Sequence, residues 1–288
     1  MEYKMQATLN LSKGFGQCGD SLAFEYRKFP AGEVYFNCAV PWDITTVRIN
    51  IRANTSDQIM LLLLAVDSLR RQGVDQIEVF MPYLPYSRQD RVCKKGDSFS
   101  LSTLCALLRA LRVGLVTYDV HSNVAEVLLD GSALRQYTNH REVFDFVDYL
   151  ELGGKHTLLV APDAGARKKI QALIDADKMG RFDDILFANK TRVSEHVITV
   201  DALDDHNLND CVCIVVDDIC DGGGTFNALG VRLQQAGCEE AYLFVSHGVF
   251  SKGTEDLLRF YKKIGTTNSI REDHVVGFCG VKKFNLDY

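Results

Sequence analysis

The sequence has little of what fibrous, membrane-bound or secreted proteins require. Five prolines and 22 glycines among 288 residues are too few for a collagen-like or proline-rich chain. The longest apolar run, Ile59 to Val66, is far shorter than the roughly 20 residues that cross a bilayer. No basic and then apolar leader opens the chain, so we do not expect secretion. These absences favour a globular protein without a membrane partner.

The cysteines indicate the cellular compartment of the protein, and the charges indicate which classes of partner to expect. The nine cysteines are an odd number, and no two of them have C-x-x-C spacing. Such a set is typical of reduced thiols, which predicts a cytoplasmic protein. Acidic residues outnumber basic ones by 38 to 32, which gives a formal net charge of -6. We therefore expect no bulk attraction to nucleic acid or to an anionic membrane, although this leaves room for a local basic pocket.

Short apolar runs alternate with amphipathic stretches along most of the chain. Five runs are near-continuous in apolarity, as parallel strands covered on both faces are. They are Ile77 to Met81, Leu115 to Tyr118, Thr157 to Ala161, Val212 to Val216 and Ala241 to Ser246. Four stretches with helical spacing lie between them, namely Ser56 to Gln72, Ser100 to Leu111, Ala166 to Asp177 and Phe226 to Gln235. This alternation predicts an α/β sheet.

The length and the polar stretches predict how the chain is divided. A chain of 288 residues fits two domains or one large α/β unit. The sequence turns polar after Leu134, which places a domain boundary near Tyr137 to Arg141. The acidic stretch Asn189 to Asp210 interrupts the alternation of short apolar runs and amphipathic stretches. It could be a long functional loop, a hairpin or plain surface.

The sharpest feature is the run V-V-D-D-I-C-D-G-G-G-T, from Val215 to Thr225. A predicted strand leads through an acid pair, Asp217 and Asp218, to three glycines, a threonine and a predicted helix. Glycine lets the backbone approach a ligand closely, and the N-terminus of a helix suits a phosphate. The two acids could grip sugar hydroxyls. The pattern therefore favours a phosphorylated pentose over a plain strand-to-helix turn, and no P-loop signature is present.

This run resembles the pentose-phosphate loop of two related families, the type I phosphoribosyltransferases and the ribose-phosphate pyrophosphokinases, or PRPP synthetases. Further segments resemble those of the PRPP synthetases and occur in the same order. They are Pro82 to Arg91, Tyr118 to Ser122, Val160 to Gly165, Asn189 to Arg192, Ser246 to Ser251 and Thr267 to Ile270. The resemblance runs from about Arg27 to about Ile270, which is most of the chain.

The resemblance implies a fold and a reaction. The implied fold is α/β, with two similar phosphoribosyltransferase-like domains, each a mainly parallel sheet flanked by helices. Residues 1–140 would form the ATP-side domain and 141–288 the ribose-5-phosphate domain, and the last segment could return to the first domain. The implied enzyme is a ribose-phosphate diphosphokinase of nucleotide biosynthesis. It would transfer the diphosphoryl group of ATP to the C1 hydroxyl of ribose 5-phosphate, giving PRPP and AMP.

The resemblance also implies the residues that bind ATP. Arginine grips phosphate bidentately, but without the family pattern Arg88 would be an ordinary surface residue. The turn around Pro30 departs from the family, which usually has an acid or asparagine where this chain has Ala31. In the family this turn often reaches a neighbouring subunit, which implies a homo-oligomer, either a dimer or a hexamer. The implied ATP-binding residues are Phe29, Ala31, Gly32, Glu33, Arg88, Gln89, Asp90 and His121.

The remaining roles implied by the resemblance concern Mg²⁺, catalysis and the pentose. The implied cofactor is Mg²⁺, held by His121, Asp119 and Asp163, although Asp163 could equally be a helix N-cap. Lys190 and Arg192 would stabilise the charge of the transition state. The implied ribose-5-phosphate residues are Arg192, Asp217, Asp218, Asp221, Gly222, Gly223, Gly224 and Thr225.

Two alternatives stay open. A type I phosphoribosyltransferase would use PRPP rather than make it, and the segments at Arg88 and Asp119 argue against it. A non-catalytic regulatory homologue would bind the sugar phosphate and modulate a partner. The presence of Lys190, Arg192 and His121 argues against that second alternative.

Overall fold

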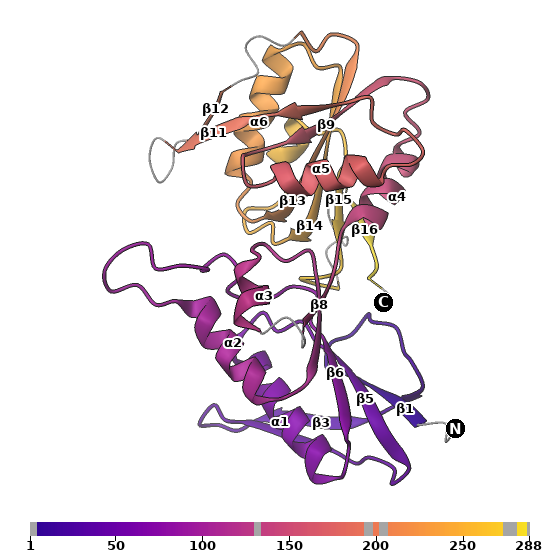
Figure 1. The fold of residues 1–288 in the computed structure, drawn as a ribbon, viewed down its shortest axis with the longest axis vertical. Helices are drawn as coiled ribbons and strands as arrows, with labels where there is room; N and C mark the ends of the chain where they lie inside the picture. The colour runs from indigo at the N-terminus through magenta and orange to yellow at the C-terminus, as the bar shows by residue number, and fades with distance from the viewer. Residues whose placement is uncertain (1–4, 130–133, 193–197, 202–206, 273–280, 287–288) are drawn as a thin grey trace. The chain divides into compact units, whose positions relative to one another are not determined.

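The structure is a computed structural model, and it describes residues 5–129, 134–192, 198–201, 207–272 and 281–286. The chain forms two compact units, each of which is described by itself (Figure 1). The N-terminal unit is Met1–Thr138 with Ser269–Glu272 and Asn285–Tyr288. The C-terminal unit is Asn139–Asn268 with Asp273–Phe284.

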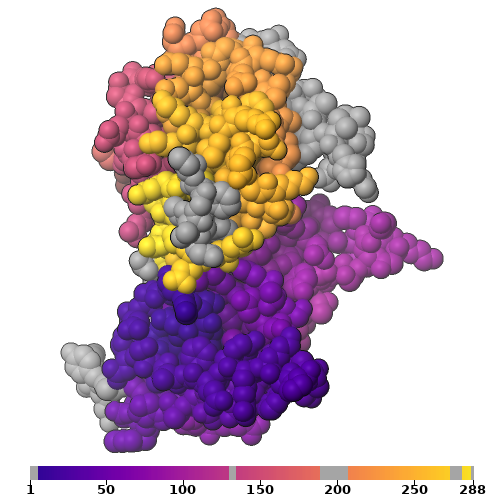
Figure 2. Space-filling view, turned by 180° about the vertical axis from the view of Figure 1, so that it is seen from behind, coloured from indigo at the N-terminus to yellow at the C-terminus, as the bar shows by residue number. Residues whose placement is uncertain are grey.

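The N-terminal unit is built on a six-stranded sheet in which every neighbouring pair is parallel. In spatial order its strands are β2 (Asp20–Ser21), β1 (Met5–Asn10), β5 (Ile44–Asn50), β6 (Gln76–Phe80), β7 (Gly114–Tyr118) and β8 (Leu134–Tyr137). An antiparallel hairpin, β3 (Phe24–Lys28) with β4 (Val34–Cys38), lies outside this sheet. The segment 91–99, between β6 and α2 (Ser100–Ala110), projects from the unit as an arm (Figure 1, Figure 2).

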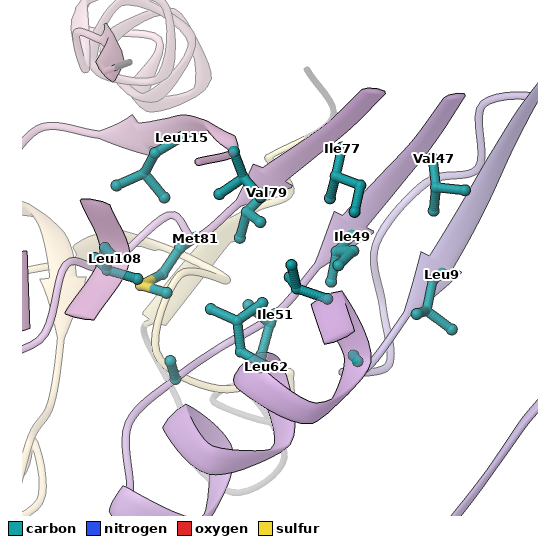
Figure 3. Close-up of a cluster of buried hydrophobic side chains, with 14 of the residues drawn as sticks. Leu9, Val47, Ile49, Ile51, Leu62, Ile77, Val79, Met81, Leu108 and Leu115 are labelled. Carbon is teal, nitrogen blue, oxygen red and sulfur yellow. The ribbon is translucent and has the colours of Figure 1, made fainter. Parts of the chain in front are cut away.

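The helices α1 (Ser56–Arg71) and α2 cover one face of this sheet. Their apolar sides join the side chains of β1, β5, β6 and β7 in one buried cluster, part of which is drawn in Figure 3. A smaller cluster on other strand positions contains Phe80, Val116, Tyr118 and Leu286. Because successive strand residues point to opposite faces, the two clusters use alternate positions such as Val79 and Phe80.

The C-terminal unit repeats the plan with a second parallel sheet of six strands. Its order is β10 (Asp184–Phe187), β9 (His156–Ala161), β13 (Cys211–Cys220), β14 (Glu240–Gly248), β15 (Ile264–Thr267) and β16 (Val281–Phe284). The helix α6 (Gly224–Gln235) packs on one face. The helices α4 (His140–Leu150) and α5 (Arg167–Ala176) pack on the other. Two apolar layers therefore bury the sheet on both sides.

These two sheets confirm the predicted fold class. All five predicted strands and all four predicted helices occur, with ends that differ by a few residues. The largest difference is in β13, which was predicted to end at Val216 but continues to Cys220. Its neighbour β14 is long enough to pair with it up to Gly248, so the ladder carries β13 past the acid pair. The sequence prediction missed α4, which begins at His140, within the predicted boundary at Tyr137 to Arg141, and continues to Leu150.

Three smaller findings concern the acidic stretch, the cysteines and the helices. Within Asn189 to Asp210, β11 (Asn189–Arg192) pairs antiparallel with β12 (Ile198–Asp201), as the hairpin alternative requires. The eight cysteines in the described ranges are free thiols, and Cys279 lies outside those ranges. Across the helices that the structure describes, none combines the length and apolarity needed to cross a membrane.

Candidate active site

The polar segments of the C-terminal unit gather at one edge of its sheet. The strands β9, β13 and β14 are parallel neighbours, so their carboxyl ends lie at the same edge. The turn with Asp163 follows β9, the glycine turn follows β13, and the segment from Val249 follows β14. In α/β sheets this edge is where ligands bind. Elements far apart in the sequence thus supply one candidate pentose-phosphate site.

The glycine turn occupies the short space between β13 and α6. Because Cys220 still pairs with Gly248, the turn consists of Asp221, Gly222 and Gly223. Gly223 is the N-cap residue of α6 and has a φ of 76°. Thr225 lies in the first turn of the helix. The first backbone N–H groups of a helix have no partner within it, so this end can receive an anion.

The acid pair lies within β13 and not beyond it, which corrects the sequence-based placement. Asp218 is buried, and its Oδ2 accepts from Nζ of Lys169 at 3.2 Å. The backbone N–H of Asp218 donates to Oδ1 of Asp217 at 2.9 Å. Burial raises the pKa of Asp217 well above its usual range, and the charges of Asp218 and Asp163 raise it further. The three carboxyl groups therefore lie close enough to repel one another when ionised.

Asp163 forms a turn ahead of α5 and is not the N-cap of that helix, which is Ala166 and has no side-chain cap bond. Its Oδ1 accepts from the backbone N–H of Gly165 at 2.9 Å and of Ala166 at 3.1 Å. These two bonds satisfy N–H groups ahead of α5. They involve only one of the two carboxylate oxygens, so this turn is compatible with a second contact.

The donor chemistry of this edge fits Mg²⁺. The ion prefers carboxylate and water oxygens, and it is usually held by one or two carboxylates together with substrate phosphates. Within the described ranges, no three His, Cys, Asp or Glu side chains are grouped so as to hold a metal by themselves. The clustered charges of Asp163, Asp217 and Asp218 would be relieved by a divalent cation. The edge thus suits an ion that is completed by a phosphorylated substrate.

In the N-terminal unit, the segment at Arg88 lies beside the segment at His121. The Asp90 carboxylate is buried and accepts from Nε and Nη2 of Arg91 at 2.7 and 2.9 Å. The bond from Arg91 lowers the pKa of Asp90 to about 2, against an opposing effect of burial. A bond from Ser122 and the charge of His121 contribute to this lowering of the pKa. The structure therefore brings together two segments that the sequence separates by about 30 positions.

Further hydrogen bonds and one uncommon backbone conformation hold these two segments in place. The amide of Gln89 donates to the carbonyl of Tyr86 at 2.8 Å, and the Gln89 side chain accepts from Oγ of Ser100 at 2.6 Å. Asp119 is buried and has a φ of 42°, an uncommon conformation for a residue other than glycine. Its amide donates to the carbonyl of Tyr137 at 2.8 Å. Such strained residues occur at functional sites when their surroundings hold them there.

The turn around Pro30, which is predicted to bind ATP, forms the tip of the β3–β4 hairpin. The amide of Phe29 donates to the carbonyl of Glu33 at 2.8 Å, and Gly32 has a φ of 99°. Ala31, Gly32 and Glu33 are exposed. Arg27 stacks on Phe29, with its guanidinium carbon 5.1 Å from the ring centre. No described contact joins this tip to Arg88 or His121, so the hairpin tip is a separate part of the predicted ATP site.

The predicted catalytic pair can be located only by its backbone. Lys190 and Arg192 belong to β11, but their side chains are outside what the structure describes. The sequence prediction missed Lys169, which pairs with Asp218 from the first turn of α5. The sequence carries a usable signal, because Lys169 follows Asp163 by six residues and so lies in the first turn of the helix after that turn. The other predicted pentose residues, Asp221 to Thr225, are brought together at the glycine turn.

The two parallel sheets, and the acid pair and glycine turn of the second, define a protein of the two-domain phosphoribosyltransferase type. Residues 20–111 match the N-terminal domain of ribose phosphate pyrophosphokinase. The ribose-phosphate pyrophosphokinase of Pyrococcus abyssi is 27% identical over 91% of this chain and 89% of the relative. That of Thermococcus kodakarensis is 29% identical over 86% of each chain. The chain is therefore similar to ribose-phosphate pyrophosphokinases over most of its length.

The fold agrees with this similarity in sequence. The crystal structure of phosphoribosylpyrophosphate synthetase from Mycobacterium smegmatis superposes with a TM-score of 0.80. The match covers 98% of this chain and 95% of that one at 19% sequence identity. The architecture is therefore shared over the whole chain while most side chains differ.

Proposed function

We propose that this protein is a ribose-phosphate diphosphokinase. The C1 hydroxyl oxygen of ribose 5-phosphate forms a bond to the β-phosphorus of ATP. The bond from that phosphorus to the oxygen bridging to the α-phosphate breaks at the same centre. AMP leaves with the bridging oxygen, the hydroxyl proton passes to solvent, and the pentose becomes PRPP.

The observation that carries this proposal is the arrangement at the end of β13. An acid pair, a glycine turn and a helix N-terminus follow one another there, which suits the hydroxyls and the phosphate of one pentose phosphate. Asp217 and Asp218 would bind the sugar hydroxyls, and Asp221 to Thr225 would surround the phosphate. The similarity to ribose-phosphate pyrophosphokinases supports the same substrate.

The nucleotide side of the proposal rests on the N-terminal unit. Arg88 and Gln89 would contact ATP from a segment that Asp90 fixes against Ser122. His121 and Asp119 would hold Mg²⁺ on the nucleotide, and Asp163 would hold it on the pentose side. When bound, Mg²⁺ neutralises the charge of the polyphosphate. The hairpin tip from Phe29 to Glu33 would serve a neighbouring copy of the chain, so we also propose a homo-oligomer.

The test is an assay of AMP release with ATP, Mg²⁺ and ribose 5-phosphate. We expect AMP and PRPP in equal amounts, and no AMP when ribose 5-phosphate is omitted. Binding of ribose 5-phosphate without AMP release would instead favour the regulatory homologue. Turnover only with PRPP and a nucleobase would favour a type I phosphoribosyltransferase.

The variant Lys190→Ala ties the activity to the proposed catalytic segment. A charge that acts mainly in the transition state affects turnover more than binding, so we expect kcat to fall by about 100-fold or more. The KM for ribose 5-phosphate should change by less than about threefold. Lys178→Ala is the matched control, because Lys178 is exposed and lies after the far end of α5. Equal losses in kcat and in binding would remove Lys190 from the catalytic role.

A further inference from the structure

The segment after β14 is fastened to the glycine turn along its length. The carbonyl of Cys220 accepts from the amides of Val249 at 2.8 Å and Phe250 at 3.2 Å. The amide of Ser251 donates to the carbonyl of Asp221 at 3.2 Å, and Oγ of Ser251 donates to Oδ1 of Asp221 at 2.6 Å. Four hydrogen bonds thus join two segments that are about 30 residues apart in the sequence.

A buried side chain and a tight turn also hold this segment in place. The Phe250 side chain is buried in the cluster that α6 covers, although its backbone has a φ of 46°. The amide of Gly253 donates to the carbonyl of Phe250 at 3.0 Å, which closes a turn over residues 250–253. Lys252 stands in that turn and is exposed. The backbone that carries Lys252 is therefore held in a defined place beside the glycine turn.

The side chain of Lys252 lies along Gly222. Its Cδ and Cε atoms are each 3.5 Å from the position that a Cβ atom on Gly222 would occupy. One further C–N bond of about 1.5 Å places the ammonium within roughly 5 Å of that point. Gly222 directly precedes the N-cap residue of α6. The ammonium thus borders the turn that leads to the free N–H groups of the helix.

The charge of Lys252 is available to a ligand. In the part of the chain that the structure describes, Lys252 takes part in no ion pair, whereas Lys169 is paired with Asp218. The end of β13 and the glycine turn are acidic, with Asp217, Asp218 and Asp221 within five positions. A phosphate dianion that approached such an edge would be repelled unless a cation offset the carboxylates.

We propose that Lys252 binds the phosphate group of the sugar phosphate at the Asp221–Thr225 turn. This inference rests on the proposed function, and it adds a binding residue from outside the glycine turn. The 5-phosphate does not react and is present in both substrate and product. Lys252 therefore contributes to binding equally before and during the reaction, and it leaves the chemical step unchanged.

The experiment measures the Kd of ribose 5-phosphate by calorimetric titration of the full chain. The variants are Lys252→Ala, Lys252→Arg and the control Lys178→Ala, which removes the same charge elsewhere on the unit. Loss of a charge-assisted phosphate contact at an exposed position should raise Kd about tenfold in Lys252→Ala. In Lys252→Arg, the rise should be smaller than about threefold, because the charge is kept. In Lys178→Ala, Kd should not change.

Two further measurements separate a local contact from other effects. The tenfold difference should shrink at about 1 M salt, because exposed charges are then screened within roughly 3 Å. The AMP-release assay should give a higher KM for ribose 5-phosphate in Lys252→Ala and an unaltered kcat. A fall in kcat with no change in KM would overturn the inference.

The outcomes distinguish this inference from the proposed function. Equal Kd values for the wild-type chain and Lys252→Ala would overturn the role of Lys252 while the proposed function stands. An equal rise in Kd for Lys178→Ala would mean that net charge alone causes the effect. That result would also overturn the role of Lys252. If the wild-type chain does not bind ribose 5-phosphate, both fail. If Lys252→Ala lowers the melting temperature, Lys252→Gln takes its place in the comparison, because glutamine keeps part of the apolar stem of the lysine.

Discussion

Gly223 has a φ of 76° and precedes the first residue of α6. In that left-handed region a side chain crowds the following carbonyl oxygen, which costs about 1–2 kcal/mol. A Cβ atom on Gly223 would also come within 3.2 Å of Cδ2 of Leu257. Gly222 does not have a left-handed φ, and a Cβ atom there would meet only the Lys252 stem at 3.5 Å. Only one of these two neighbouring glycines is required by the backbone.

This difference predicts the outcome of a pair of substitutions. Gly223→Ala should lower the free energy of unfolding by about 1–2 kcal/mol, because the alanine must adopt a left-handed conformation. Gly222→Ala, the matched control, should change it by less than about 0.5 kcal/mol. Hydrogen exchange of the α6 amides would report both values. Equal losses in the two variants would mean that backbone conformation does not determine the need for glycine.

At the scale of the element, the N-terminus of α1 is capped by residues of the helix and its immediate neighbour. The Thr55 hydroxyl accepts from the amide of Gln58 at 3.3 Å, and Oε1 of Gln58 accepts from the amide of Thr55 at 2.9 Å. This reciprocal pair is a capping box. Asp57 adds a negative charge in the first turn, and Arg70 and Arg71 add positive charges in the last. Local residues therefore define both ends of this helix.

Thr55→Ala should lower the free energy of unfolding by about 1 kcal/mol, because it leaves an N–H group of α1 without its partner. Thr55→Ser, which keeps the hydroxyl, should lose far less. Urea unfolding followed by circular dichroism would measure both variants. If the alanine and serine variants have the same stability, the cap does not stabilise this helix.

The elements also differ in how well local sequence predicts them. The helix α4 buries Val143, Phe146 and Val147, which have helical spacing. That signal is present in the sequence, but it directly follows the polar residues Tyr137 to Arg141 and gives no helix prediction in the sequence analysis. The end of β13 is a different case, because Asp217 and Asp218 have low strand propensity. The partner strand β14 decides that end, and no local pattern reveals its length.

At the scale of the whole molecule, one carboxylate connects three parts of the C-terminal unit. Glu240 begins β14 and accepts from Lys262, which precedes β15, and from the Tyr242 hydroxyl. Lys155, which precedes β9, lies 3.6 Å from Oε1 of Glu240. The bonds from Lys262 and Tyr242 lower the pKa of Glu240 to about 2, against an opposing effect of burial. The ionised form is therefore the one that the fold stabilises.

This lowered pKa predicts a dependence of stability on pH. The pKa of Glu240 is lower in the folded chain than its unfolded value of 4.5, so its contribution is present above pH 4.5 and is lost towards pH 2. Because Lys262 is partly exposed, we expect about 1–2 kcal/mol at pH 7. Glu240→Gln should be less stable than the wild-type chain at pH 7, and the difference should vanish near pH 2. Hydrogen exchange of the β14 amides measures this difference.

The control for that experiment is Glu255→Gln, which removes an exposed carboxylate from the same unit. It should follow the wild-type chain at every pH. A difference between Glu240→Gln and the wild-type chain that stays constant from pH 7 to pH 2 would contradict an electrostatic origin.

The sequence by itself determined five central strands and four helices, the parallel character of the sheets and the place of the glycine turn. Apolar periodicity and the conformational demands of glycine are local properties, so they can be read from neighbouring residues. Only the tertiary structure decided that Asp217 and Asp218 lie inside β13, that Lys169 pairs with one of them, and that Lys252 lies along Gly222. Those relations depend on pairing between strands and on packing between segments distant in the chain, which no local pattern specifies.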